Sequence, residues 1–190
     1  MKKKYKLVAL IGKAATGKDT MLKAFCEKYN SVNKCVSTTT RPKREGEQEG
    51  VDYFYVDRNE FTKKVIDFDM LEATIFNDWF YGLEKKALRE DKINISILNP
   101  NGVRAILENE EIDLLVFNII SPDRDRILRY LQREEKCDIR EMFRRYEEDE
   151  KDFDTSRFDF DFKVIVNQGN TEISTLVEDI KNGIIDYWGK

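Results

Sequence analysis

A strand of buried type that runs directly into a glycine- and lysine-containing loop is the feature that most constrains this fold. Residues 5–11 are almost continuously apolar, as in a strand buried on both faces, and residues 12–20 read Gly-Lys-Ala-Ala-Thr-Gly-Lys-Asp-Thr. A helical pattern of apolar residues follows. Glycines allow a tight turn that aims successive N–H groups at anionic oxygens, and the positive end of the helix adds to the attraction. The pattern predicts a strand–loop–helix unit that holds the phosphates of a nucleoside triphosphate.

The loop matches Gly-x-x-x-x-Gly-Lys and then departs from the usual pattern, because Asp19 occupies the position of a serine or threonine. We expect Lys18 to place its charge on the β- and γ-phosphates. Asp19 could bind Mg²⁺ directly or through water, which we favour, or it could only cap the helix while Thr20 serves the phosphates. The loop residues predicted to bind the triphosphate are Gly12, Lys13, Ala14, Ala15, Thr16, Gly17, Lys18, Asp19 and Thr20.

The absence of histidine restricts the chemistry of any active site. Without it, the usual general base at neutral pH and the commonest transition-metal ligand are missing, so catalysis must rest on carboxylates, cations and positioning. The net charge of −4 gives no general attraction to nucleic acid or to an anionic membrane, and no stretch approaches a membrane-spanning length. Three cysteines without a Cys-x-x-Cys pair indicate a reducing cytoplasm, and we expect all three to be structural.

Strands and helices alternate along most of the chain. The prediction is an α/β fold, a P-loop NTPase core with a parallel five-stranded sheet flanked by helices. Further core strands are expected near 93–98, 114–120 and 161–166, with helices near 102–108, 123–150 (broken near 134–138) and 171–188, the last with Ile173, Leu176, Val177 and Ile180 inward.

The segment from 35 to 86 breaks this alternation. Strands are expected near 34–40, 51–56, 70–76 and 79–82, with a helix over 59–69 that places Phe61, Val65 and Phe68 on one side. We therefore predict a small mixed-β, acceptor-binding insert and a single domain of 1–190 in three parts. These are a core (1–34, 87–124 and 151–190), the insert (35–86) and a helical lid (125–150).

A basic stretch after residue 36 carries the second phosphate signal. It reads Ser37-x-x-x-Arg41-x-x-Arg44-x-Gly46-Glu47-x-x-Gly50-x-Asp52-Tyr53. Two arginines three positions apart form a fork that suits a phosphate monoester. The stretch resembles the acceptor-binding signature of guanylate kinases. The resemblance extends through Glu72 with Phe76, Tyr81-Gly82, the lid arginines Arg129, Arg133 and Arg144, and the last core strand 163–167 with its terminal Asn167.

The resemblance implies transfer of the γ-phosphoryl group of MgATP to GMP or dGMP, giving ADP and GDP or dGDP. Acceptor binding then falls to Ser37, Arg41, Arg44, Tyr53, Glu72, Tyr81 and Asn99; ATP binding to the loop with Arg129 and Asn167; and catalysis to Lys18, Arg44, Arg133 and Arg144. The implied cofactor is Mg²⁺, with Asp19 as its candidate ligand. A carboxylate at position 72 can accept from both N1–H and the exocyclic amine of guanine, whereas adenine offers no N1 donor. We also expect the 35–86 and 125–150 segments to close toward each other when both substrates bind.

Several positions depart from the family pattern. Ala14-Ala15 replaces Ser-Gly, Leu83 replaces a serine that helps read the guanine carbonyl, and Ile97 and Asn99 replace two aspartates. One alternative is thus a related kinase with another nucleoside monophosphate or a ribose bisphosphate as acceptor. Another is a non-catalytic, guanylate-kinase-like protein-binding module, against which Lys18 and the lid arginines argue. No nucleic-acid or membrane partner is expected, and monomer and homodimer both remain open.

Overall fold

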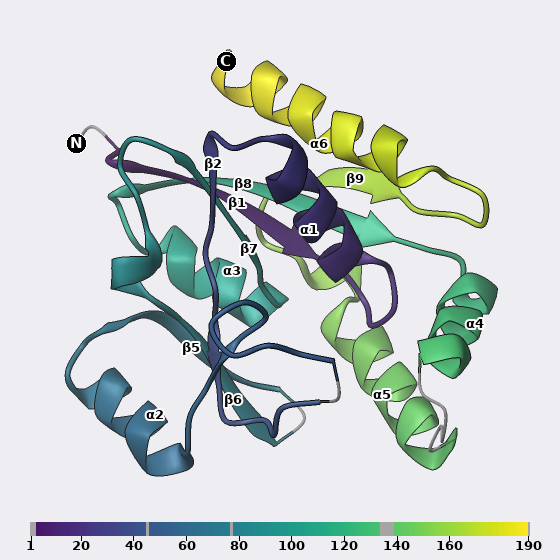
Figure 1. Ribbon diagram of the computed structural model, residues 1–190, viewed down its shortest axis with the longest axis horizontal. Coiled ribbons are helices and arrows are strands. Elements are labelled where there is room, and N and C mark those ends of the chain that lie inside the picture. The colour runs from purple at the N-terminus through teal and green to yellow at the C-terminus, as the bar shows by residue number, and fades with distance from the viewer. Residues whose placement is uncertain (1–2, 45, 77, 134–138, 190) are drawn as a thin grey trace. The chain divides into compact units, whose positions relative to one another are not determined.

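The computed structural model describes residues 3–44, 46–76, 78–133 and 139–189, apart from the side chains of Phe76, Arg133 and Glu141. Figure 1 shows the helices and strands of the chain. By its internal contacts the chain divides into two compact units. The first unit consists of Met1–Val8 and Ser31–Leu114, and the second of Ala9–Asn30 and Leu115–Lys190. Both the first strand and the strand that contains Leu114 therefore pass from one unit to the other.

The main sheet has five strands in the order β2-β7-β1-β8-β9. β1 (Tyr5–Ile11) is central, and its residues 7–11 are completely buried, as the unbroken apolar run predicts. β2 (Val32–Lys34) pairs in parallel with β7 (Ile93–Ile97), and β8 (Ile112–Ile120) pairs in parallel with β9 (Lys163–Val166). The predicted α/β fold with a parallel five-stranded sheet is confirmed.

The first unit contains a second, mixed sheet in the order β4-β3-β6-β5. β3 (Thr38–Thr39) pairs in parallel with β4 (Phe54–Tyr55), whereas β6 (Trp79–Glu84) runs antiparallel to both β3 and β5 (Met70–Phe76). The helices of this unit are α2 (Arg58–Ile66), the short η1 (Lys85–Ala87) and α3 (Pro100–Leu107). The expectation of strand-rich, mixed structure between 35 and 86 is confirmed.

The second unit supplies the remaining helices. They are α1 (Lys18–Lys28), α4 (Asp123–Arg133), α5 (Ile139–Asp152), the short η2 (Thr155–Arg157) and α6 (Ile173–Trp188). α6 packs on α1 and β9 and buries Leu176, Val177 and Ile180 as predicted. The expected helix break at 134–138 lies outside the described residues. In the described part of the chain, no helix is long and apolar enough to cross a membrane.

One predicted inward-facing residue is exposed, and one predicted helical face is incomplete, both at helix ends. Ile173 is 38% exposed because it is the first residue of α6. Phe68 is 78% exposed because α2 ends at Ile66 and Phe68 takes a left-handed backbone (φ 59°), which turns it off the helical face. Val65 is also 42% exposed, so Phe61 alone of this trio is buried. Periodicity extended past a helix end assigns a face that the backbone no longer has.

Candidate donor and acceptor half-sites

The predicted phosphate loop lies between β1 and α1 in the second unit and requires glycine at two positions. Gly12 and Gly17 have positive φ angles of 146° and 94°. A Cβ on Gly12 would stand 2.3 Å from the carbonyl oxygen of Ile119, and one on Gly17 would stand 2.5 Å from Asn167 Nδ2. Ala15 is also left-handed (φ 59°), a conformation that costs an L-residue about 1–2 kcal/mol. The surroundings must therefore hold the loop in a shape that its own sequence does not favour.

Side chains hold the carbonyl groups of this loop one after another. Lys18 Nζ donates to the carbonyl oxygens of Gly12 (2.8 Å) and Lys13 (2.9 Å). Arg126 Nε donates to the Ala14 carbonyl (3.0 Å), and Arg129 Nη1 to that of Ala15 (3.3 Å). The Thr16 carbonyl accepts from Asn167 Nδ2 at 2.8 Å and, at a longer 3.4 Å, from the Ser121 hydroxyl. The N–H and C=O of a peptide point in opposite directions. Carbonyls that are bound on one face of the loop therefore turn the neighbouring N–H groups toward the opposite face, as an anion site requires.

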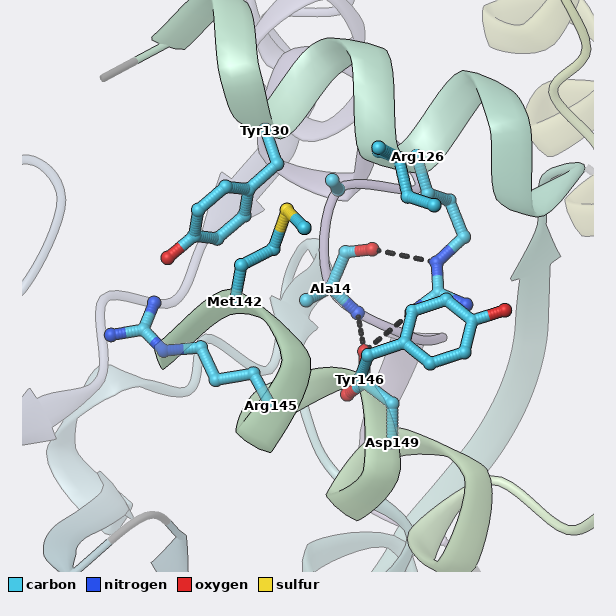
Figure 2. Close-up of a pocket in the computed structure, with 9 residues that line it drawn as sticks. Ala14, Arg126, Tyr130, Met142, Arg145, Tyr146 and Asp149 are labelled. Atoms are coloured by element: carbon cyan, nitrogen blue, oxygen red, sulfur yellow. Dashed lines mark hydrogen bonds and ion pairs between the residues drawn. The ribbon is translucent and has the colours of Figure 1, made fainter. Parts of the chain in front are cut away.

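Ala14 is held at both ends of its backbone. Its N–H donates to Asp149 Oδ2 (2.7 Å), and the same carboxylate accepts from Arg126 Nη2 (2.6 Å). Figure 2 shows the resulting ring, with Arg126 reaching the loop from α4 and Asp149 from α5. Arg126 is 3% and Asp149 1% exposed, and the Arg126 guanidinium also stacks on Tyr146, 4.9 Å from the ring centroid. Burial raises the pKa of Asp149, while the Ala14 amide and Arg126 oppose the rise.

The other residues predicted to act on the ATP side do not all lie together. Arg129 Nη2 donates to Asn167 Oδ1 (3.2 Å), so the structure brings together the two predicted ATP-binding residues outside the loop. Arg144 lies exposed on α5 and pairs with Glu148, one helical turn away. The side chain of Arg133 lies outside the described residues. Thr20 is exposed and follows Asp19 in the first turn of α1.

The candidate metal ligand is a single carboxylate. Asp19 is exposed in the first turn of α1. Among the residues that the structure describes, no group of three or more acidic, histidine or cysteine side chains could hold a metal by itself. Mg²⁺ is commonly bound by one or two carboxylates together with substrate phosphates, so this arrangement fits a metal that arrives with a nucleotide.

The predicted phosphate-binding side chains of the acceptor side gather in the first unit. The Arg41 guanidinium lies 5.4 Å from the Tyr53 ring centroid, and the Tyr53 and Tyr81 rings meet edge-on at 6.0 Å. Arg41 is only 7% exposed, so its charge is largely removed from water. Arg44 follows in the same loop and is half-buried. One cation and two phenols thus come together from three separate segments.

Glu47 is a component of this cluster to which sequence reasoning assigned no role. Its carboxylate accepts from Arg41 Nη2 (2.7 Å), from the Arg44 amide (2.8 Å) and from the Tyr55 hydroxyl (2.7 Å). Burial alone would raise the pKa of Glu47, but these hydrogen bonds lower it to about 2. Glu47 therefore orients Arg41 and closes the 41–47 loop, a role that spacing alone does not reveal because Tyr55 and Arg41 approach from different segments.

Glu72 on β5 has a buried carboxylate that lies beside the start of α3. It is 6% exposed, and a Cβ on Gly102 would stand 3.0 Å from its Oε2. Burial raises the pKa of Glu72 to about 7, although a backbone hydrogen bond from Leu83 partly opposes the rise. Gly102 lies in the first turn of α3, where the positive end of the helix faces the carboxylate. Ser37, the other predicted base reader, is half-buried just before β3.

Asn99 has structural hydrogen bonds on both sides of its amide. Its Oδ1 accepts from the Gly102 N–H (2.8 Å) and so caps α3, and its Nδ2 donates to Thr74 Oγ1 (2.9 Å). An acceptor contact by Asn99 remains a prediction, but the side chain already joins α3 to β5. Asparagine is a favoured N-cap residue, and Pro100 at the first helical position completes a local start signal.

Comparison with known proteins adds to this geometry. The sequence profile described as "Guanylate kinase" matches residues 4–184. The chain belongs to the guanylate kinase family. A guanylate kinase of Chlorobaculum tepidum is 29% identical over 187 residues, which cover 96% of this chain and 93% of that protein. One from Sulfurimonas denitrificans is 33% identical over 120 residues, 61% of this chain and 58% of that protein.

Solved structures show the same fold. The crystal structure of guanylate kinase from Anaplasma phagocytophilum superposes with a TM-score of 0.70 at 24% identity, covering all of this chain and 90% of the other. Leu83 is a position at which we expect a departure from the family pattern. The Leu83 side chain is completely buried, so this position contributes packing to the insert and not a polar group for a base.

Proposed function

We propose that this protein transfers the γ-phosphoryl group of MgATP to GMP or dGMP, giving ADP and GDP or dGDP. Family membership over residues 4–184 supports the reaction type. The observation that carries the acceptor assignment is the buried carboxylate of Glu72, in the same unit as the cluster of Arg41, Tyr53 and Tyr81. An ionised Glu72 accepts from N1–H and the exocyclic amine of guanine, and adenine would place a lone pair against it.

On the donor side, the loop amides and Lys18 hold the triphosphate, and Arg129 and Asn167 bind toward the adenine end. Their mutual hydrogen bond and the Asn167 contact to Thr16 support this assignment. Mg²⁺ would be held by phosphate oxygens and Asp19, and it would neutralise charge on the transferring group. Phosphoryl transfer needs alignment and cations more than covalent chemistry, which suits a chain without histidine.

On the acceptor side, Arg41, Arg44, Tyr53 and Tyr81 bind the phosphate of the nucleoside monophosphate. Arg41 now donates to Glu47, so the incoming phosphate shares the guanidinium with that carboxylate. Sharing keeps the buried charge paired when the site is empty, since an isolated buried cation is costly. Ser37 and Glu72 read the base, with Asn99 beside them.

Arg133 and Arg144 act in catalysis with Lys18 and Arg44 by bringing positive charge to the transferred group. This requires the 35–86 and 125–150 segments to close, which also excludes water and prevents wasteful hydrolysis of ATP. Small-angle scattering with a bisubstrate analogue tests the closure: the radius of gyration should fall, and an unchanged value would contradict it. The proposed setting is the cytoplasm, as a monomer or homodimer, without nucleic-acid or membrane partners.

The decisive experiment is a coupled assay of ADP formation with ATP and one acceptor at a time. The acceptors are GMP, dGMP, AMP, UMP, CMP, dTMP and a ribose bisphosphate, with Lys18→Met as the inactive control. We expect turnover with GMP and dGMP. Because Leu83 offers no hydrogen bond, discrimination against other bases should be weaker by one or a few kcal/mol than in a site with a full set of base contacts. No turnover with any acceptor, together with failure to bind ATP, would overturn the enzyme assignment in favour of a binding module.

A further inference from the structure

A ring of hydrogen bonds through Ala14 stands apart from the roles assigned so far. Asp149 accepts from the Ala14 N–H, Arg126 donates to the Ala14 carbonyl, and the two side chains pair with each other (Figure 2). Neither side chain was singled out as a site residue by its sequence context. Both are nearly inaccessible to water, although the helices that carry them are rich in exposed charge.

A buried ion pair is an expensive way to join two helices. Desolvation of both charges offsets their attraction, and well-packed apolar residues of similar size often do as well or better. The cost is easier to explain when the charges do something that apolar side chains cannot do. Here they hold a backbone N–H and a backbone C=O of the same residue through charge-assisted bonds, which are shorter and stronger than neutral ones.

The neighbouring residue indicates what is being held. Ala15 has a left-handed backbone although it carries a Cβ. Such a conformation persists when the surroundings over-determine it. Arg126 and Asp149 restrain Ala14, the residue before Ala15. Arg129 binds the carbonyl of Ala15, and Asn167 binds the carbonyl of Thr16.

We propose that Arg126 and Asp149 are positioning residues that keep the phosphate loop in its nucleotide-binding shape before ATP arrives. They act through Ala14 and not by touching the substrate. This inference rests on the proposed ATP-binding role of the loop. A preformed loop does not have to be ordered by the ligand, so binding energy is not consumed in ordering it.

Two substitutions disrupt the ring in different ways. Arg126→Met keeps the length of the side chain but removes the donor to the Ala14 carbonyl, together with the ion pairs to Asp149, Asp123 and Glu150. Asp149→Asn keeps the shape and an acceptor for the Ala14 N–H but removes the charge. Loss of one charged hydrogen bond should weaken ATP binding roughly tenfold or more. In steady state the KM for ATP should rise by a similar factor, whereas kcat and the KM for GMP should change much less.

Three comparisons show whether the effect is positional. Gly183→Ala is the stability control, because its Cβ would meet the Phe117 ring at 2.6 Å in the core of the same unit. Arg157→Met is the charge control, because it removes an exposed ion pair with Asp154. Arg126→Lys serves where Arg126→Met does not fold, since it keeps the charge and the packing stem but not the two-pronged donor geometry. Both controls should bind ATP like the wild type.

Isothermal titration calorimetry with ATP, well below each variant's melting temperature, is the primary measurement. Weakened ATP binding in the ring variants but not in Gly183→Ala or Arg157→Met supports the inference. ATP binding by the ring variants within twofold of wild type would overturn it. Tighter ATP binding by Asp149→Asn would also overturn it, because Asp149 would then compete with phosphate for the Ala14 N–H. Wild-type protein that does not bind ATP also overturns it. Wild-type protein that binds ATP but phosphorylates neither GMP nor dGMP overturns the proposed function alone.

Discussion

The buried carboxyl of Glu72 should make the stability of the protein depend on pH, and substitution by glutamine isolates its contribution. Its pKa is raised from 4.5 to about 7 by burial, despite a hydrogen bond from the Leu83 backbone. A carboxyl with a raised pKa favours the folded state when protonated and opposes it when ionised. The destabilisation is therefore absent below pH 4.5 and fully present above pH 7.

The size of the effect follows from the same shift. At about 1.4 kcal/mol per pH unit, the full destabilisation is about 3 kcal/mol, and about three-quarters of it develops between pH 5 and pH 8. Glu72→Gln has nearly the same shape but does not titrate. The free energy of unfolding of Glu72→Gln, minus that of the wild type, should thus increase by about 2 kcal/mol over this range.

Urea unfolding of both proteins at pH 5, 6, 7 and 8 measures this difference, with ionic strength held constant. All other titrating groups are common to the two proteins and cancel. A difference that stays constant with pH would show that Glu72 titrates normally and would refute the reasoning. GMP binding supplies a second readout: wild-type affinity should fall below pH 7 as the carboxyl is protonated, beyond any fall seen with Glu72→Gln.

Three further substitutions test two close contacts and one left-handed backbone position, each by urea unfolding. Gly102→Ala should add up to about 1 kcal/mol of helix stability to α3. Its Cβ, 3.0 Å from Glu72 Oε2, should also displace that carboxylate and raise the KM for GMP. An unchanged KM would argue against the placement of Glu72. Ala15→Gly should stabilise by up to about 1 kcal/mol because it relieves a left-handed alanine; a loss of stability would contradict this. Gly183→Ala should destabilise by about 1–3 kcal/mol through overlap with the Phe117 ring, and a stability equal to wild type would show that the core yields there.

Local signals predicted much of the candidate site. The strand over 5–11, the loop and the start of α1 are contiguous in the chain, so their order and glycine positions determine the local backbone. Arg41, Tyr53 and Tyr81 were recognised as a pattern of residues, and the structure brings them together. Their convergence depends on the pairing of β3 with both β4 and β6, which no local rule provides.

Contacts were missed where a side chain's partner or its burial depends on distant segments. Neither Arg126 nor Asp149 is among the predicted site residues, yet they form the ring that holds Ala14. An acceptor contact by Asn99 stays a prediction, and the sequence did not indicate that its amide also caps α3 and binds Thr74. In each case the residue type is compatible with several neighbours, and the sequence does not say which one is near.

The sequence by itself determined the chemistry of the phosphate loop, because two glycines and Lys18 act on a backbone that is continuous with them. It also determined the type of fold, since long apolar runs must be buried and their alternation with helices restricts how. Only the tertiary structure decided how an alanine can occupy a left-handed position in that loop. Arg129 binds the carbonyl of this alanine, Ala15, and Arg126 and Asp149 hold the preceding residue, Ala14. These side chains come from two other helices, and the burial that strengthens the bonds of Arg126 and Asp149 exists only after the chain has folded.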